Sequence, residues 1–237
     1  KDSKNNRIIY IAEKHDGKNE PVNSIVSVDL NNSGAITTIT SGADFYSSPV
    51  ISPDGVTLAW IQWNHPNMPW DSTELYIADL EDGYIRNPRK LLGNGESICH
   101  PTWSPNGILY YVSDVSGWWN IHKYENGASH NLTPFDGEFA QAQWNLGVSF
   151  YDFINDNQII CAYNKSGFWK IGLLDTITYD LNDIDTVAKF TEINRSGLKA
   201  SNDRVLFTLG SPDTPYALYL YQPNDLQKLK KIQESTP

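Results

Sequence analysis

The segment Leu75-Tyr76-Ile77-Ala78-Asp79-Leu80 is one copy of a strand pattern that recurs along this chain at a spacing of about 50 residues. The other copies are Ile25-Val26-Ser27-Val28-Asp29-Leu30, Ile121-His122-Lys123-Tyr124, Ile171-Gly172-Leu173-Leu174 and Leu218-Tyr219-Leu220-Tyr221. A period of about 40 to 50 residues, built only from strand-like segments, is typical of the blades of a β-propeller. The repeat therefore predicts an all-β fold before any single residue is considered.

Two further markers keep the same period. Ser52-Pro53-Asp54-Gly55 returns as Ser104-Pro105-Asn106-Gly107, and Gly117-Trp118-Trp119-Asn120 returns as Gly167-Phe168-Trp169-Lys170. In the first pair, proline presets φ, Asp or Asn bonds its own backbone, and glycine ends a tight turn without strain. Each of these tetrads therefore predicts a hairpin between the first two strands of a blade, and not a catalytic site.

The period predicts about five four-stranded blades in residues 1–237, which form either a single propeller domain or a fragment of a larger propeller. The expected blades cover roughly residues 7–40, 43–92, 97–133, 139–190 and 196–233. The fourth blade is expected to have a weaker version of the hairpin turn at Trp144-Asn145-Leu146-Gly147. Ile51, Trp103 and Trp144 precede the turns, so we expect these large apolar side chains to pack between adjacent blades.

The first blade is expected to lack its innermost strand. A polar stretch, residues 1–7, leads directly into Ile8-Ile9-Tyr10-Ile11, which matches the second strand of the later blades. An incomplete blade exposes backbone groups and apolar surface. We therefore expect the chain to be part of a longer protein, and an open arc of blades would be expected to pair with another copy as a homo-oligomer.

Composition excludes several classes of partner. The net charge of −10 and the pI near 4.8 argue against nucleic acid, whose binding depends on Lys and Arg neutralising phosphates. No apolar run approaches the roughly 18 residues of a membrane span. Cys99 and Cys161 both lie in apolar strand sequence, so we expect buried free thiols and favour a reducing, cytoplasmic location.

The loops between second and third strands, and those leading to the next blade, are expected to open on one face of the propeller. The longest of them, Asn64 to Asp71, is stiffened by two prolines. Because loops on rigid scaffolds often carry function, this loop and the Gly117 turn supply the candidate residues. The candidates for substrate binding or domain docking are Asn64, His65, Pro66, Asn67, Met68, Trp70, Asp71, Trp118, Trp119 and Asn120.

Structural interpretations of the same residues stay open. Trp63, Met68 and Trp70 could fold back as a small satellite core that closes the loop. In each aromatic pair, Trp118-Trp119 and Phe168-Trp169, we expect one ring to be buried and the other to lie near the surface. A metal site at His65 and Asp71 lacks a third ligand at a sensible spacing, so no metal and no cofactor are predicted.

Motifs for catalysis are absent from the sequence. There is no Gly-x-Ser-x-Gly elbow, since Gly127-Ala128-Ser129-His130-Asn131 fails at its last position. Glycine-rich phosphate loops, Cys-x-x-Cys pairs and His-Glu-x-x-His are also missing. No catalytic residue is therefore assigned in this chain.

Several of these segments together resemble the N-terminal propeller of prolyl oligopeptidase family serine peptidases. The resemblance rests on Ser41 to Pro49, the Ser52 tetrad, Leu58 to Asp71, and Val112-Ser113-Asp114 with the Gly117 turn. It is strongest from Gly42 to Asn120, is closest to the bacterial dipeptidyl aminopeptidase and acylaminoacyl peptidase branch, and is most specific in the Asn64 to Asp71 loop. The tetrads alone also occur in TolB-like propellers of many functions.

The resemblance implies a two-domain enzyme in which a propeller of about seven blades caps an α/β-hydrolase domain with a Ser, Asp and His triad. The propeller would screen peptide substrates by size and help to bind the end of the peptide. This chain contains no such catalytic domain, so no triad residue carries over. The implied partners are the α/β-hydrolase domain of the same polypeptide and peptide substrates.

Two rival functions remain open. The first is a freestanding, TolB-like propeller that binds a protein partner through the same loop face, which would need an export signal and would be periplasmic. The second is a propeller enzyme with its own acidic or metal site in the central channel. A gene that continues for about 250 residues with a Gly-x-Ser-x-Gly motif would favour the peptidase over both.

Overall fold

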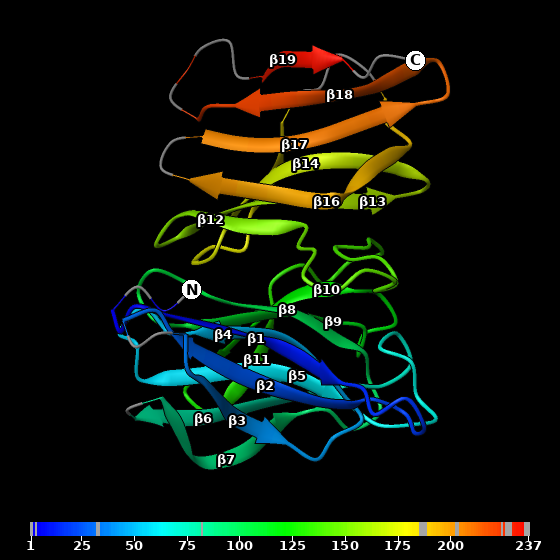
Figure 1. The fold of residues 1–237 in the computed structure, drawn as a ribbon. Helices are drawn as coiled ribbons and strands as arrows, with labels where there is room; N and C mark the ends of the chain where they lie inside the picture. The colour runs from blue at the N-terminus through cyan, green and yellow to red at the C-terminus, as the bar shows by residue number, and fades with distance from the viewer. Residues whose placement is uncertain are drawn as a thin grey trace. The chain divides into compact units, whose positions relative to one another are not determined.

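A computed structural model describes residues 2, 4–31, 34–81, 83–184, 189–201, 204–223, 225 and 229–234, with the side chains of 195, 196 and 234 left out. Every regular element in this described part is a β-strand (Figure 1). The chain divides into two compact units, Lys1–Tyr111 and Val112–Pro237, with the boundary inside β9. The all-β propeller class predicted from the repeat is confirmed.

Unit 1 begins with a three-stranded sheet in the order β1-β2-β3. Its strands are β1 (Arg7–Lys14), β2 (Val22–Asp29) and β3 (Ile36–Ser41). The next sheet has the order β4-β5-β6-β7. Its strands are β4 (Phe45–Ile51), β5 (Thr57–Trp63), β6 (Glu74–Glu81) and β7 (Tyr84–Leu92). Among the described residues β1 pairs along its length only with β2, so the expected lack of an inner strand in the first sheet is confirmed.

The remaining three sheets are four-stranded, and each follows chain order from one edge to the other. The third consists of β8 (Ile98–Trp103), β9 (Leu109–Ser113), β10 (Asn120–Glu125) and β11 (Ala128–Asn131). The fourth consists of β12 (Tyr151–Asn155), β13 (Gln158–Lys165), β14 (Phe168–Asp175) and β15 (Leu181–Asp183). The fifth consists of β16 (Glu192–Ser201), β17 (Arg204–Ser211), β18 (Thr214–Tyr221) and β19 (Leu229–Glu234). Consecutive antiparallel strands of this kind are the strand order of propeller blades.

The two Ser-Pro tetrads form the predicted hairpin turns. Between β4 and β5, Ser52 Oγ donates to Asp54 Oδ1 at 2.6 Å and accepts the Thr57 N–H at 2.9 Å. Between β8 and β9, Ser104 Oγ likewise accepts the Ile108 N–H at 2.9 Å. The serine thus closes the turn from within, and the structural interpretation of the tetrads is confirmed.

The turn predicted at Trp144 to Gly147 is wrong. These residues precede β12, and the first hairpin of the fourth sheet instead turns at Asp156 and Asn157, after Asn155. Asn155 Oδ1 accepts the Asn157 N–H at 3.0 Å, so a polar side chain closes this turn without proline or glycine. Trp144 is therefore 68% exposed and not buried between blades. Trp103 behaves as expected, because its indole Nε1 donates to Val50 O at 3.3 Å across two sheets of unit 1.

Each unit has its own apolar core. In unit 1 the buried cluster centres on Ile25, Leu58 and Trp60. In unit 2 a larger cluster joins side chains of the fourth and fifth sheets, among them Ile160 and Phe207. Cys99 and Cys161 are buried free thiols, as predicted. Burial raises the pKa of the Cys161 thiol, so its reactive thiolate form is suppressed. No helix in the described residues has the length and hydropathy needed to cross a bilayer.

Candidate functional site

The candidate residues fall into two groups, one in each unit, and each group is described by itself. The first is the loop between β5 and β6. Asp71 donates its N–H to Met68 O at 2.9 Å, while Met68 donates its N–H to Asp71 Oδ2 at 2.9 Å. Asn67 N donates to Asn64 O at 3.1 Å, and the His65–Pro66 peptide bond is cis. The loop therefore has internal hydrogen bonds at both of its turns.

Neighbouring loops of unit 1 hold this loop in place. Asp44, in the β3–β4 connection, donates its N–H to Asn64 Oδ1 at 2.8 Å and accepts the His65 N–H through Oδ2 at 2.9 Å. On the other side, Ser97 Oγ donates to Pro69 O at 2.9 Å, where both residues are buried. The loops between β3 and β4, β5 and β6, and β7 and β8 therefore gather as expected.

Aromatic side chains pack beneath the loop, so the expected satellite core of Trp63, Met68 and Trp70 is formed in part. Trp63 is 6% exposed and stacks on Phe45 with ring centroids 5.3 Å apart. The His65 ring meets the same Phe45 edge-on at 5.0 Å. Trp70 is half-buried, but Met68 is 44% exposed and does not join the core. The anchor is thus Phe45 with Trp63, while Asn64 to Met68 face solvent.

His65 and Asp71 do not come together around a common point. His65 Nε2 lies 3.1 Å from Glu20 Oε2, in the β1–β2 loop, and both side chains are more than half exposed. The Asp71 carboxylate is engaged by the Met68 N–H. Across the described residues, no three His, Cys, Asp or Glu side chains are grouped so that they could hold a metal ion.

The second candidate group, in unit 2, is the turn before β10. Gly117 has a φ of +88°, a conformation that favours glycine, and donates its N–H to Asp114 O at 2.7 Å. This turn leaves Trp118 39% exposed. Trp119 is half-buried, so the first aromatic pair follows the expected division only in part.

Asn120 is 1% exposed, and its amide is fully used inside the chain. Its Nδ2 donates to Phe135 O and Gly137 O, each at 3.2 Å. Its Oδ1 accepts from Ser116 Oγ at 2.8 Å and from Asn131 Nδ2 at 3.0 Å. Any part that Asn120 plays at a docking surface therefore works through positioning the turn that carries Trp118.

Glu138 belongs to this group, although sequence reasoning missed it. Its Oε2 accepts the Trp119 N–H at 2.9 Å, and its backbone exchanges two hydrogen bonds of 2.9 Å with Asn164. Burial raises the pKa of the Glu138 carboxyl, the Trp119 N–H opposes this, and the Asp114 carboxylate adds to the rise. No motif marks Glu138, and only its place between Pro134 and Phe139, a predicted inter-blade loop, could have pointed to it.

The matching aromatic pair follows the prediction closely. Phe168 is 41% exposed, whereas Trp169 is 5% exposed and packs in the core of unit 2. The Lys189 ammonium lies 5.5 Å from the centre of the Phe168 ring. Trp118 and Phe168 are thus exposed rings at matching turns of neighbouring sheets, and each is followed by a less exposed ring.

Several solved structures of known proteins share the fold of this chain. No family model and no curated protein matches the chain. Among solved structures, puromycin hydrolase is 28% identical with a TM-score of 0.89, over 99% of this chain and 37% of that chain. A puromycin-hydrolyzing peptidase of Mycobacterium tuberculosis is 30% identical with a TM-score of 0.87, over 98% of this chain and 37% of that one.

More distant structures share the fold alone. Prolyl oligopeptidase B of Galerina marginata is 12% identical with a TM-score of 0.73, over 99% of this chain and 33% of that chain. TolB of Acinetobacter baumannii is 15% identical with a TM-score of 0.64, over 98% of this chain and 54% of that chain. The chain thus spans little more than a third of the length of the puromycin-hydrolysing enzymes that it matches.

The five sheets and these matches define the class of protein first: the chain is a β-propeller. Its strands follow one another across each sheet, and the match to other propellers runs over nearly the whole chain. Puromycin-hydrolysing enzymes match nearly this whole chain at 28 to 30% identity, and prolyl oligopeptidases share its fold, which is consistent with the N-terminal propeller of a peptidase of the prolyl oligopeptidase family.

Proposed function

We propose that this chain is the non-catalytic propeller domain of a serine peptidase of the prolyl oligopeptidase family. In this proposal it caps an α/β-hydrolase domain of the same polypeptide. One observation carries the proposal: the match covers 99% of this chain but only 37% of puromycin hydrolase. The larger part of such an enzyme lies outside the match and has room for a catalytic domain.

The proposed role of the propeller is to position the hydrolase domain and to exclude large substrates from its active site. The loops around Asn64 to Asp71 are fixed by hydrogen bonds to Asp44 and Ser97, so they present a shaped surface at little entropic cost. Exposed rings such as Trp118 and Phe168 are the kind of apolar anchor that docking surfaces use. These surfaces would contact the hydrolase domain and limit which substrates reach its nucleophile.

The proposed substrates are short peptides and related amides. Two similar proteins are named for the hydrolysis of puromycin, which is a small molecule with an amide bond. The dipeptidyl aminopeptidase and acylaminoacyl peptidase branch would make short free or acylated peptides the preferred substrates. A propeller that restricts access favours such small molecules over folded proteins.

The test is made on the intact protein that the gene encodes. We expect a fluorophosphonate probe to label one serine in a Gly-x-Ser-x-Gly segment that lies outside this chain. We also expect hydrolysis of short peptide anilides and little cleavage of denatured casein. A gene whose reading frame stops at Pro237, or an intact protein that the probe does not label, would contradict the proposal.

The rival function is a freestanding propeller that binds a protein partner. It is supported by the fold-level likeness to TolB, which this chain covers to 54% of its length. The 28 to 30% identity to the puromycin-hydrolysing enzymes, against 15% to TolB, favours the peptidase. The two differ in location: the peptidase is proposed to be cytoplasmic, while the rival needs an export signal upstream and a periplasmic protein in cell fractionation.

A further inference from the structure

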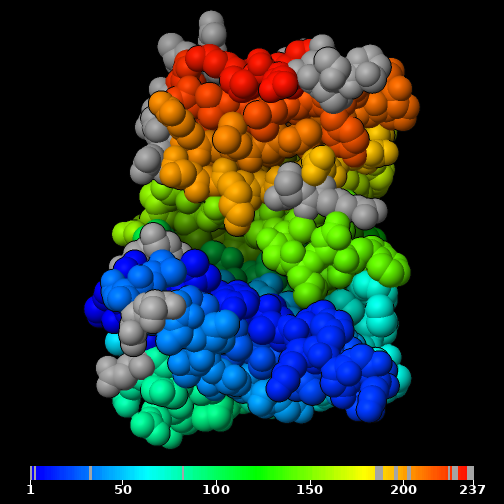
Figure 2. All heavy atoms as spheres, viewed as in Figure 1, coloured from blue at the N-terminus to red at the C-terminus, as the bar shows by residue number. Residues whose placement is uncertain are grey.

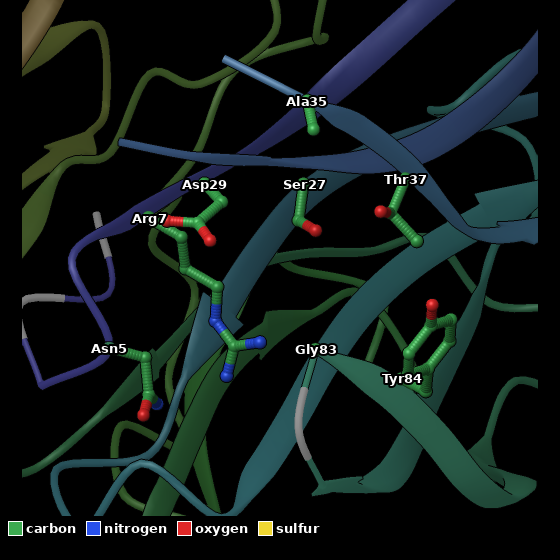
Figure 3. Close-up of a pocket in the computed structure, with 8 residues that line it drawn as sticks. All are labelled: Asn5, Arg7, Ser27, Asp29, Ala35, Thr37, Gly83 and Tyr84. Atoms are coloured by element: carbon green, nitrogen blue, oxygen red, sulfur yellow. The ribbon is translucent and has the colours of Figure 1, made fainter. Parts of the chain in front are cut away.

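A polar cavity of about 310 Å³ lies in unit 1, between the first sheet and the β6–β7 hairpin (Figure 3). Its walls include Arg7, Ser27, Asp29, Thr37, Gly83 and Tyr84. A volume of this size is on the scale of a small-molecule site. The strands that form most of its wall belong to the first sheet, whose atoms are blue on the near face of this unit (Figure 2).

The register of the first sheet places the polar side chains together. Arg7 pairs with Asp29 across β1 and β2, and Ser27 pairs with Thr37 across β2 and β3. Residues directly opposite on neighbouring strands, and residues two apart on one strand, share a face of the sheet. These four side chains therefore share one face of the sheet.

Arg7 is the main unused donor of the cavity. Arg7 is 7% exposed, and its Nε donates a hydrogen bond to Asp2 Oδ2 at 2.6 Å. Neither Nη nitrogen has an acceptor among the described residues. A Cβ atom on Gly83, whose φ is +89°, would lie 2.6 Å from one Nη, so glycine leaves space for this guanidinium. The Arg7 Nη groups lie at the cavity, where an oxygen atom of a ligand could accept hydrogen bonds from them.

Three hydroxyl groups surround the same space. In Figure 3 the hydroxyls of Ser27 and Thr37 lie in the space between the Arg7 guanidinium and Tyr84, and the Tyr84 hydroxyl points toward Thr37. Within the described part of the chain these hydroxyls form no hydrogen bond. Tyr84 is 54% exposed, so the face of its ring is also open to a ligand. Asp29 accepts the Asn31 N–H through Oδ1 at 2.8 Å, and it adds carboxylate acceptors to the wall.

The charges argue against an anionic ligand. Asp2 is ion-paired with Arg7, and Asp29 then leaves an excess negative charge at the wall, in a chain whose net charge is −10. A ligand hydroxyl can accept from a guanidinium and donate to a carboxylate or another hydroxyl. We propose that this cavity binds a small, neutral, polyhydroxylated molecule of the saccharide class through Arg7, Asp29 and the hydroxyls of Ser27 and Thr37.

This site is separate from the candidate loops. The Asn64 to Asp71 loop precedes β6, whereas Gly83 follows it, so the two lie at opposite ends of that strand. The proposal depends only on unit 1 and does not require the peptidase function.

The test is saturation-transfer NMR on the intact protein with methyl α-D-glucopyranoside, methyl β-D-galactopyranoside, trehalose and glycerol. We expect transfer from the protein to at least one of these probes. Ser27→Ala and Thr37→Val should each weaken the binding of that probe about fivefold, the effect of one lost hydrogen bond. Thr38→Val is the matched control, because Thr38 is the exposed neighbour on the opposite face of β3 and its change should leave binding unaltered.

Several results would overturn the proposal. The proposal is wrong if no saturation transfer to any of the four probes is seen. It is also wrong if the wild type, Ser27→Ala and Thr37→Val all give equal transfer. Acetate, inorganic phosphate and glycine are tested in the same way. Binding of one of these in place of the polyols, with loss in Ser27→Ala, would assign the cavity to an anion or a zwitterion instead. Circular dichroism of each variant confirms that it is folded before it is scored.

Discussion

At the scale of single residues, the half-buried carboxyl of Glu138 makes stability depend on pH. Burial raises the pKa of this carboxyl in the folded protein above its value in the unfolded protein. At pH values between these two pKa values, the folded protein therefore binds more protons than the unfolded protein. Stability contributed here is therefore present at low pH and is lost as pH rises through the folded pKa. Glu138→Gln keeps an oxygen acceptor for the Trp119 N–H but does not titrate.

We therefore expect Glu138→Gln to flatten the pH dependence of urea unfolding between pH 4 and pH 7, and to be at least as stable as wild type at pH 7. Asp136→Asn is the control, because it removes one exposed charge from the same loop. A wild-type protein that gains stability relative to the Glu138→Gln variant as pH rises through this range would contradict the assignment.

A second residue-scale prediction concerns Asp16, at the surface of the β1–β2 loop. Hydrogen bonds from the Asn19 N–H, the Lys18 N–H and the Asn19 side chain lower the pKa of Asp16 to about 2. Because this folded pKa is depressed, the loop conformation should persist above pH 4 and be lost as pH falls through about 2. The side-chain carbonyl shift of Asp16 in an NMR titration reports the midpoint, and a midpoint near pH 4 would refute the prediction.

At the scale of elements, the Asn64 to Asp71 loop is predicted to depend on Asp44. Asp44→Ala removes the acceptor of the His65 N–H, which should reduce amide hydrogen-exchange protection at His65 about fivefold. Amides of β5 should keep their protection, because their ladder is untouched. Asn67→Ala is the matched control, since only the backbone of Asn67 contributes a hydrogen bond here. Equal loss throughout β5 would show that Asp44 supports the sheet and not the loop.

Elements with strong local signals were predicted well. β5 (Thr57–Trp63) lies where the sequence leaves room for a strand, because its apolar run is bounded by the predicted Ser-Pro-Asp-Gly turn and by the polar Asn64 to Asp71 loop. The fourth sheet was less predictable, since its first turn at Asp156 and Asn157 lacks the proline and glycine that marked the others. Trp144 was then assigned to a turn by spacing alone.

The candidate loop was also found from sequence, but its internal support was not. Length and two prolines identified Asn64 to Asp71. The bonds that fix it come from Asp44 and Ser97, which are distant in sequence and carry no motif. Glu138 and the cavity around Arg7 were missed for the same reason, because both depend on register and on contacts between strands or loops.

At the scale of the whole molecule, a substitution of the exposed Trp118 distinguishes a docking role of this side chain from a structural role. Trp118 is 39% exposed, so Trp118→Ser should change the urea midpoint of the propeller little. If the ring contacts a hydrolase domain or substrate in the intact protein, the same change should lower kcat/KM for short peptide anilides about tenfold, as loss of an aromatic anchor does.

The controls are chosen from the same unit. Val115→Ser alters a 65% exposed residue of the same turn and should leave kcat/KM unchanged. Trp169→Ala removes a ring that is 5% exposed and should destabilise the fold itself. An intact enzyme whose kcat/KM is the same in Trp118→Ser and wild type would remove Trp118 from the docking surface, because the propeller would then tolerate its loss both in stability and in activity.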